Sequence, residues 1–203
     1  MLGDLFNAWP GDDDSGDPFN APVIDAFRRL SDRGVLLMFQ HGNRDFLLGS
    51  LFAQLTGGTL LPEEIVIGVE GTPTLLMHGD QLCTDDIGYQ KFRAQVRNPQ
   101  WQQTVLTQPL AMRKALAKEM REGSDASKAG KAMDIMDVNA DAVADAFRRH
   151  GVSRLIHGHT HRPARHTLVV DGRECERIVL PDWRESGAYV SVDAARIETH
   201  PLD

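Results

Sequence analysis

Apolar and polar positions along this chain predict helices and strands that follow one another in turn. Apolar residues at helical spacing predict helices over 22–33, 46–55, 86–96 and 141–149. Short apolar runs bounded by turn residues predict strands over 35–39 (buried), 65–69, 74–77 and 152–156. The end of the chain is strand-rich, with strands predicted over 165–170, 176–180, 188–192 and 196–199. This order predicts an α/β protein with two packed sheets.

Residues 98–138 break this alternation and predict a helical insertion. Apolar residues recur at helical spacing between Trp101 and Met120, and basic residues run from Arg113 to Lys131. Two interpretations fit. One is a surface helix pair whose cations face water. The other is a cap whose apolar residues meet acyl chains and whose basic residues meet phosphate or a membrane surface. The pattern alone does not separate them.

Composition limits the class of protein. The 203 residues fit one domain, and 41% hydrophobic with 25% charged residues is typical of a soluble globular protein. A formal net charge of −7 argues against a general nucleic-acid-binding protein. No apolar stretch in the sequence approaches the roughly 20 residues of a membrane span. Cys83 and Cys175 form no CxxC pair, which favours a reduced, cytoplasmic setting.

Three histidines within five residues are the strongest chemical signal in the chain. His157, His159 and His161 follow the strand predicted over 152–156. Histidine is the commonest metal ligand, and loops at strand ends are where rigid scaffolds present reactive groups. The motif therefore favours a metal site over a surface histidine cluster.

Three more segments repeat a layout of apolar run, glycine turn and polar side chain. They are Gly3-Asp4, His41-Gly42-Asn43-Arg44-Asp45 and Met77-His78-Gly79-Asp80. Asp, Asn and His together suit Mn²⁺, Mg²⁺, Fe or Zn²⁺. Asp45 and Asp80 are interpreted as turn-forming or supporting residues, and the acidic run Asp12–Asp14 as a solvated loop rather than a cation site.

The order of these segments resembles the calcineurin-like metallophosphoesterases over nearly the whole chain. Cys83–Gln90 and Ile135–Asn139 are most similar to the members that act on a UDP-linked diacylglucosamine lipid in lipid A biosynthesis. The resemblance implies a layered sandwich of two mixed β-sheets flanked by helices, formed by one domain over 1–203 with a helical lid at about 98–138. The family's opening Asp-x-His strand has no counterpart before Gly3-Asp4, so we expect the chain to lack that strand and the next helix.

The resemblance also implies a ligand set for two Mn²⁺ ions. Asp4 would bridge both ions, Asn43, His78 and His159 would complete the second site, and His161 would bind the first. Because the Asp-x-His ligands of the first site have no counterpart, we expect one well-held ion.

Catalytic and substrate-binding residues follow from the same resemblance. The implied catalytic residues are Asp4, Asn43, Arg44 and His159. The implied substrate-binding residues are Asn43, Arg44, Asp86, Tyr89, Ser124, Lys128, Lys131 and His159. The family has Asn at the position of Lys128.

The chemistry of individual residues refines this picture. The Arg44 guanidinium can bind phosphate oxygens through two hydrogen bonds, the alternative being a salt bridge to Asp45. His157 is interpreted as structural or as a support for a neighbouring ligand. Trp9 fits the edge of the site and an ordinary core position almost equally, whereas Phe92 is interpreted as helix packing.

The implied reaction is hydrolysis of the pyrophosphate bond of the lipid, with water attacking the α-phosphorus and UMP as one product. A substrate with two acyl chains implies a peripheral protein on the cytoplasmic face of the inner membrane, with no nucleic-acid partner. Two alternatives remain. They are a metallophosphoesterase for another phosphodiester or nucleotide, and an inactive metal- or lipid-binding remnant.

Overall fold

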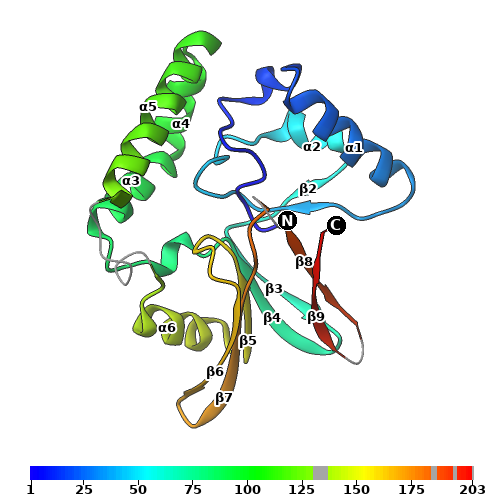
Figure 1. Cartoon of the computed structure of the whole chain (residues 1–203), viewed down its shortest axis with the longest axis vertical. Coiled ribbons are helices and arrows are strands. Elements are labelled where there is room, and N and C mark those ends of the chain that lie inside the picture. Colours follow the sequence, from blue (N-terminus) through cyan, green and yellow to red (C-terminus); the bar gives the residue numbers. More distant parts are fainter. Residues whose placement is uncertain (130–136, 184–186, 194–195, 203) are drawn as a thin grey trace. The chain divides into compact units, whose positions relative to one another are not determined.

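The computed structural model describes residues 1–129, 137–183, 187–193 and 196–202, with the side chains of 124–129 left out. The chain forms two compact units (Figure 1). The first comprises Met1, Gly3–Pro62 and the described part of Asp86–Ile135, and the second comprises Leu2, Glu63–Asp85 and the described parts of Met136–Asp203. Each unit is therefore assembled from segments that are far apart in the sequence.

An aromatic core holds the amino-terminal part of the first unit together. Its elements are η1 (Asp12–Asp14), α1 (Asn20–Asp32), β1 (Met38–Phe39), α2 (Ser50–Thr56) and β2 (Thr59–Leu60). The rings of Phe6, Trp9, Phe39 and Phe52 are buried, with neighbouring centroids 4.6–6.0 Å apart. Such ring pairs stabilise a fold beyond the area they bury. The core fixes the amino-terminal loop against the segment after β1, where Trp9 N donates to the Arg44 carbonyl at 3.1 Å.

Three consecutive helices follow in the first unit. They are α3 (Ile87–Val96), α4 (Pro99–Leu106) and α5 (Leu110–Ala129). Side chains that accept from backbone amides start two of them, Asp86 for α3 and Asn98 for α4. The apolar positions at helical spacing between Trp101 and Met120 thus lie on α4 and α5, whereas an insertion over 98–138 stays a prediction. None of the described helices combines the length and apolar character needed to cross a membrane.

A mixed five-stranded sheet forms the centre of the second unit. Its order is β3-β4-β5-β7-β6. The strands are β3 (Glu64–Val69), β4 (Thr72–Met77), β5 (Arg154–His157), β6 (Ala164–Val170) and β7 (Arg173–Val179). The other elements described in this unit are η2 (Asp80–Leu82), α6 (Ala140–His150) and an antiparallel pair, β8 (Ala188–Val192) with β9 (Ile197–Pro201). Leu75, Met77 and Leu155 from the sheet pack with Phe147 of α6 in a buried core. The predicted α/β class is confirmed.

The parallel pairing inside this sheet places two predicted site segments at one edge. β4 pairs in parallel with β5, and β5 in parallel with β7. The carboxyl ends of parallel neighbours meet at the same edge of a sheet. His78 directly follows β4 and His157 ends β5, so the two histidine segments lie next to each other.

An ion cluster links α6 to β3 in the second unit. Glu64 accepts from Arg149 at 2.9 Å and from His150 at 2.7 Å. Burial raises the pKa of Glu64, but the hydrogen bonds from Arg149 and His150 outweigh it and lower the pKa to about 2. The carboxylate is therefore charged over the whole neutral and mildly acidic range.

Two sequence interpretations need correction. The strand predicted as buried over 35–39 is wrong in part, because β1 has two residues and Leu36 is 85% exposed. Only Leu37 and Phe39 face the aromatic core, as alternation along a strand with one buried face requires.

The acidic run Asp12–Asp14 is not simply solvated. Asp12 accepts from the Gly49 and Phe52 amides near the start of α2, and Asp14 is 7% exposed.

Candidate metal ligands and an apolar pocket

His78 follows β4 and is held by backbone groups of the second unit. Its ring is 3% exposed, and Nδ1 lies 2.7 Å from the carbonyl oxygen of Leu2. Because a carbonyl only accepts, Nδ1 carries a proton, and Nε2 of the neutral ring is the nitrogen suited to a metal. The His78 carbonyl accepts from the Gly158 amide at 2.8 Å. This hydrogen bond fixes His78 beside the histidine loop after β5.

His159 lies against His78 at a separation that suits a shared ion. Its Nδ1 is 3.2 Å from His78 Nε2. Two nitrogens that each lie about 2.1 Å from one ion, at an angle of roughly 90–110°, are separated by about 3.0–3.4 Å. The pair therefore fits two ligands of one divalent ion. Asp4, His78 and His159 together have the donor types that hold such an ion.

Three predicted ligands have a left-handed backbone. The angle φ is 55° at Asp4, 67° at His159 and 56° at His161. Among the other described non-glycine residues, positive φ occurs at Glu70 and Asp171, and each precedes the glycine of a two-residue hairpin turn. The ligands have no such turn to account for their conformation. Strained backbone of this kind costs roughly 1–3 kcal/mol per residue and clusters at functional sites.

The outer histidines of the motif have different surroundings. His161 Nδ1 lies 2.8 Å from Asp182 Oδ2, the arrangement by which a carboxylate orients a metal-binding imidazole. His157 is fully buried, and burial lowers its pKa to about 4. Its Nδ1 donates to the Gly158 carbonyl at 2.9 Å and its Nε2 accepts from Arg177 at 3.1 Å. These contacts support the structural interpretation of His157.

A buried carboxylate in the first unit fixes Asp4. Asp45 has no exposed surface and accepts from the amides of Asp4 at 3.2 Å, Leu5 at 2.7 Å and Gly42 at 2.6 Å. A Cβ atom on Gly42 would overlap the backbone and carboxylate of Asp4, so a side chain there is excluded. Asp45 thus ties the loop after β1 to the amino-terminal loop, which agrees with its interpretation as a turn-forming or supporting residue.

Arg44 and Asn43 lie on the same loop as Asp45. The Asp4 carboxylate accepts from the Arg44 amide at 3.0 Å, and its other oxygen lies 3.4 Å from Arg44 Nε. Arg44 Nη1 is 3.4 Å from Asn7 Oδ1. Asn43 and Arg44 both line the pocket described below. The loop thus presents a cation and an amide next to the Asp4 carboxylate.

The remaining predicted substrate residues have varied positions. Asp86 caps α3 by accepting from the Tyr89 amide at 3.0 Å, which is a structural task in itself. Ser124 and Lys128 belong to α5, but their side chains lie outside the described atoms. Lys131 lies outside the described residues.

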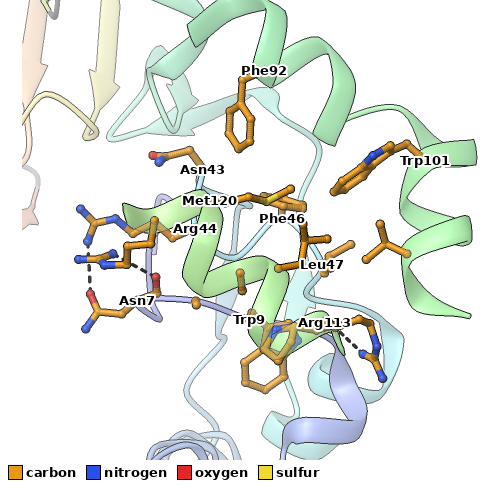
Figure 2. Close-up of a pocket in the computed structure, with 16 residues that line it drawn as sticks. Asn7, Trp9, Asn43, Arg44, Phe46, Leu47, Phe92, Trp101, Arg113 and Met120 are labelled. Atoms are coloured by element: carbon orange, nitrogen blue, oxygen red, sulfur yellow. Dashed lines mark hydrogen bonds between the residues drawn. The ribbon is translucent and has the colours of Figure 1, made fainter. Parts of the chain in front are cut away.

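An elongated pocket opens within the first unit, between the amino-terminal loop, the loop after β1 and helices α3 to α5. The space among these elements, counted together with the open solvent at its mouth, is about 710 Å³. Figure 2 shows Asn7, Asn43 and Arg44 toward one end and Arg113 at the other, with apolar side chains between them. The lining residues are Asn7, Ala8, Trp9, Pro10, Asn43, Arg44, Phe46, Leu47, Phe92, Trp101, Val105, Arg113, Leu116, Ala117, Met120 and Arg121. A mainly apolar pocket with a few polar groups at its end is a typical ligand site.

Sequence reasoning placed some of these residues and missed others. Trp9 is 2% exposed, as a core position requires, and it also forms part of the pocket wall. Phe92 lines the pocket and also contacts the ring of Tyr89 on the same helix. Arg97 was missed: its Nη2 donates to the carbonyls of His41 and Gly42 at 3.2 and 3.0 Å. An arginine at a helix end carries no sequence signal for such a distant contact.

Comparison with known proteins gives close relatives. The chain is 54% identical over all of its 203 residues to a protein of Cellvibrio japonicus named UDP-2,3-diacylglucosamine hydrolase, and covers 84% of it. It is 50% identical over 198 residues to proteins of the same name from Salmonella typhi and Salmonella arizonae, covering 82% of each. No protein-family model matches the chain.

Proposed function

Because the chain belongs to the UDP-2,3-diacylglucosamine hydrolase family, we propose that it hydrolyses the pyrophosphate bond of UDP-2,3-diacylglucosamine. Attack of water at the α-phosphorus gives UMP and 2,3-diacylglucosamine 1-phosphate, a step of lipid A biosynthesis. The observation that carries this proposal is the pocket, which has Asn43 and Arg44 toward one end and an apolar wall beyond them. The proposed substrate likewise has a polar part, the pyrophosphate, and an apolar part, the acyl chains.

In this proposal Asp4, Asn43, His78 and His159 would hold one divalent ion, expected to be Mn²⁺. His161 and Asp4 would contribute to a second, weakly held position. A bound ion supplies an activated water and positive charge for attack at phosphorus. The 3.2 Å separation of the His78 and His159 nitrogens supports the first set. The contact of His161 with Asp182 supports the role of His161.

Arg44 and Asn43 act on the phosphate groups. The Arg44 guanidinium donates to phosphate oxygens and offsets the charge that develops in the transition state. Its position beside Asp4 supports this role, since a phosphorus next to the ligands would lie within its reach. The remaining proposed substrate contacts are Asp86, Tyr89, Ser124, Lys128, Lys131 and His159.

The apolar wall of the pocket takes an acyl chain. Phe46, Leu47, Trp101 and Met120 surround the space beyond Arg44. Burying hydrocarbon against such side chains contributes about 0.8 kcal/mol per methylene. This supports the cap interpretation of the helical insertion over a surface helix pair.

A substrate of this kind resides in a membrane, so we place the enzyme on the cytoplasmic face of the inner membrane as a peripheral protein without nucleic-acid partners. Exposed cations and apolar residues on α5 support surface attachment. The Lys118 side chain is 77% exposed, and Met112 is 58% exposed. Basic residues near an anionic membrane contribute roughly 1 kcal/mol each.

The decisive experiment measures UMP release with Mn²⁺ from UDP-2,3-diacylglucosamine and from UDP-N-acetylglucosamine, which has a single acetyl group in place of the long acyl chains. We expect release only from the lipid, and loss of release in Arg44→Ala. Arg28→Ala is the control, because Arg28 is an exposed cation that pairs with Asp32 away from the pocket. Equal cleavage of both substrates favours a phosphoesterase of broader specificity. Metal binding with no cleavage of either favours a binding remnant.

Lys131→Ala separates substrate binding from metal binding. We expect this variant to lose substrate turnover while its Mn²⁺ affinity, measured by calorimetry, stays that of the parent. Loss of Mn²⁺ binding in the variant would contradict a substrate role for Lys131.

A further inference from the structure

A buried arginine lines one end of the pocket. Arg113 is 5% exposed, and it donates from Nη1 to the Pro10 carbonyl at 2.6 Å and from Nε to the Gln108 carbonyl at 2.9 Å. Its guanidinium also pairs with the Asp13 carboxylate through both terminal nitrogens. A Cβ atom on Gly11 would overlap this guanidinium, so the chain packs directly against it. Arg113 is thus held in one position from several sides.

The two polar ends of the pocket are separated along α5. Near one end, Arg121 Nη1 donates to the Asn7 carbonyl at 3.2 Å, and Asn7 contacts Arg44. Arg113 lies eight residues earlier on the same helix, which corresponds to about 12 Å at a rise of 1.5 Å per residue. Leu116, Ala117 and Met120 line the pocket between them. Figure 2 shows the same order, with Met120 between Arg44 and Arg113.

We propose that Arg113 sets the maximum length of the acyl chain that the pocket accepts. This inference rests on the proposed function, in which the chain enters from the Arg44 end. An extended hydrocarbon advances roughly 1.3 Å per carbon, since its C–C bonds are about 1.5 Å long. About nine or ten carbons therefore fit before the chain meets the guanidinium. Further methylenes meet a charged group, and burial against it without a polar partner is unfavourable.

The chain-length dependence of binding tests this limit. Dissociation constants are measured by calorimetry for n-alkyl phosphates of increasing length, whose phosphate probes the Arg44 end. Each buried methylene strengthens binding about fourfold. For the parent we expect this gain up to about ten carbons and a plateau beyond. In Arg113→Met the gain continues, so a chain two carbons past the plateau binds roughly 16-fold more tightly than it binds the parent.

Lys114→Met is the matched control. Lys114 neighbours Arg113 on α5 and pairs with Asp14 at 2.6 Å and Asp17 at 3.0 Å, but it is not part of the pocket wall. We expect this variant to keep the plateau of the parent. If Arg113→Met does not fold by circular dichroism, Arg113→Gln, which retains a donor toward Pro10, takes its place. Its shorter, uncharged side chain should move the plateau to longer chains.

Two results would overturn the length limit. One is a parent without a plateau, and the other is a plateau that stays in place when Arg113 is substituted. UMP release is measured separately, so the two proposals fail independently. A plateau without UMP release refutes the reaction and keeps the limit, whereas UMP release without a plateau refutes the limit alone.

Discussion

Asp45→Asn tests how the first unit positions its predicted ligand. In the parent, Asp45 Oδ1 accepts from the Gly42 and Asp4 amides, and Oδ2 accepts from the Leu5 amide. Asparagine keeps one acceptor oxygen and turns the other into a donor. At least one backbone N–H then faces an N–H₂ group in a site with no exposed surface.

The magnitude follows from these contacts. A hydrogen bond to a charged group contributes about 1.5–3 kcal/mol, and a buried donor without an acceptor costs a further 1–3 kcal/mol or so. Part of this cost is recovered by relaxation of the loop, so we expect a loss of about 2–4 kcal/mol in the free energy of unfolding of the first unit. The Mn²⁺ affinity should fall as well, since Asp4 N is one of the groups affected.

Urea denaturation followed by tryptophan fluorescence measures this loss, because Trp9 belongs to the aromatic core of the same unit. Asp32→Asn is the control, because Asp32 is 59% exposed and forms an ion pair with Arg28 at 2.9 Å. This substitution should lower the free energy of unfolding by less than about 0.5 kcal/mol. A decrease of less than about 1 kcal/mol in the free energy of unfolding of Asp45→Asn, with an unchanged dependence on urea concentration, would refute the assigned role of the carboxylate.

Three more predictions follow. Gly42→Ala should abolish Mn²⁺ binding because the new methyl group displaces Asp4. Gly123→Ala is the control, because Gly123 has open space around it. Mn²⁺ binding retained in Gly42→Ala would contradict the packing argument. Treatment with a chelator should abolish UMP release and added Mn²⁺ should restore it; undiminished release after chelation would refute a metal mechanism. The pKa of Glu64 is lowered to about 2. The ionised carboxylate therefore stabilises the folded state above pH 4.5, and this stabilisation is lost as the pH falls toward 2. Between pH 5 and 2 we expect the free energy of unfolding of the parent to fall by about 1–2 kcal/mol more than that of Glu64→Gln, after allowance for partial exposure. An equal pH dependence of unfolding in the two proteins would contradict this.

Local chemistry made much of this fold predictable. The order of helices and strands follows from apolar spacing, and the structure adds capping side chains at two helix starts, Asp86 and Asn98. The histidine loop was recognisable because it directly follows a short apolar run. In these places the decisive interactions are made within a few residues of the signal.

Contacts between distant segments were not predictable in the same way. Arg113 contacts Asp13, which is 100 residues away, and no spacing rule links the two. The acidic run was therefore interpreted as solvated, although Asp14 is buried beside Lys114. The strand at 35–39 failed for a related reason: a continuous apolar run does not reveal whether one face or both faces will be covered.

At Asp4, His159 and His161 the left-handed backbone lowers folding stability, whereas the proposed metal-dependent activity requires the side chain. Glycine adopts such angles without the steric cost that other residues carry, roughly 1–2 kcal/mol per position. Selection for thermostability alone would therefore favour glycine at these three positions, and selection for metal-dependent activity would remove it. A library of single variants sorted for stability and for activity should show opposite preferences there. Positions of this kind would mark the ligands without any metal being bound.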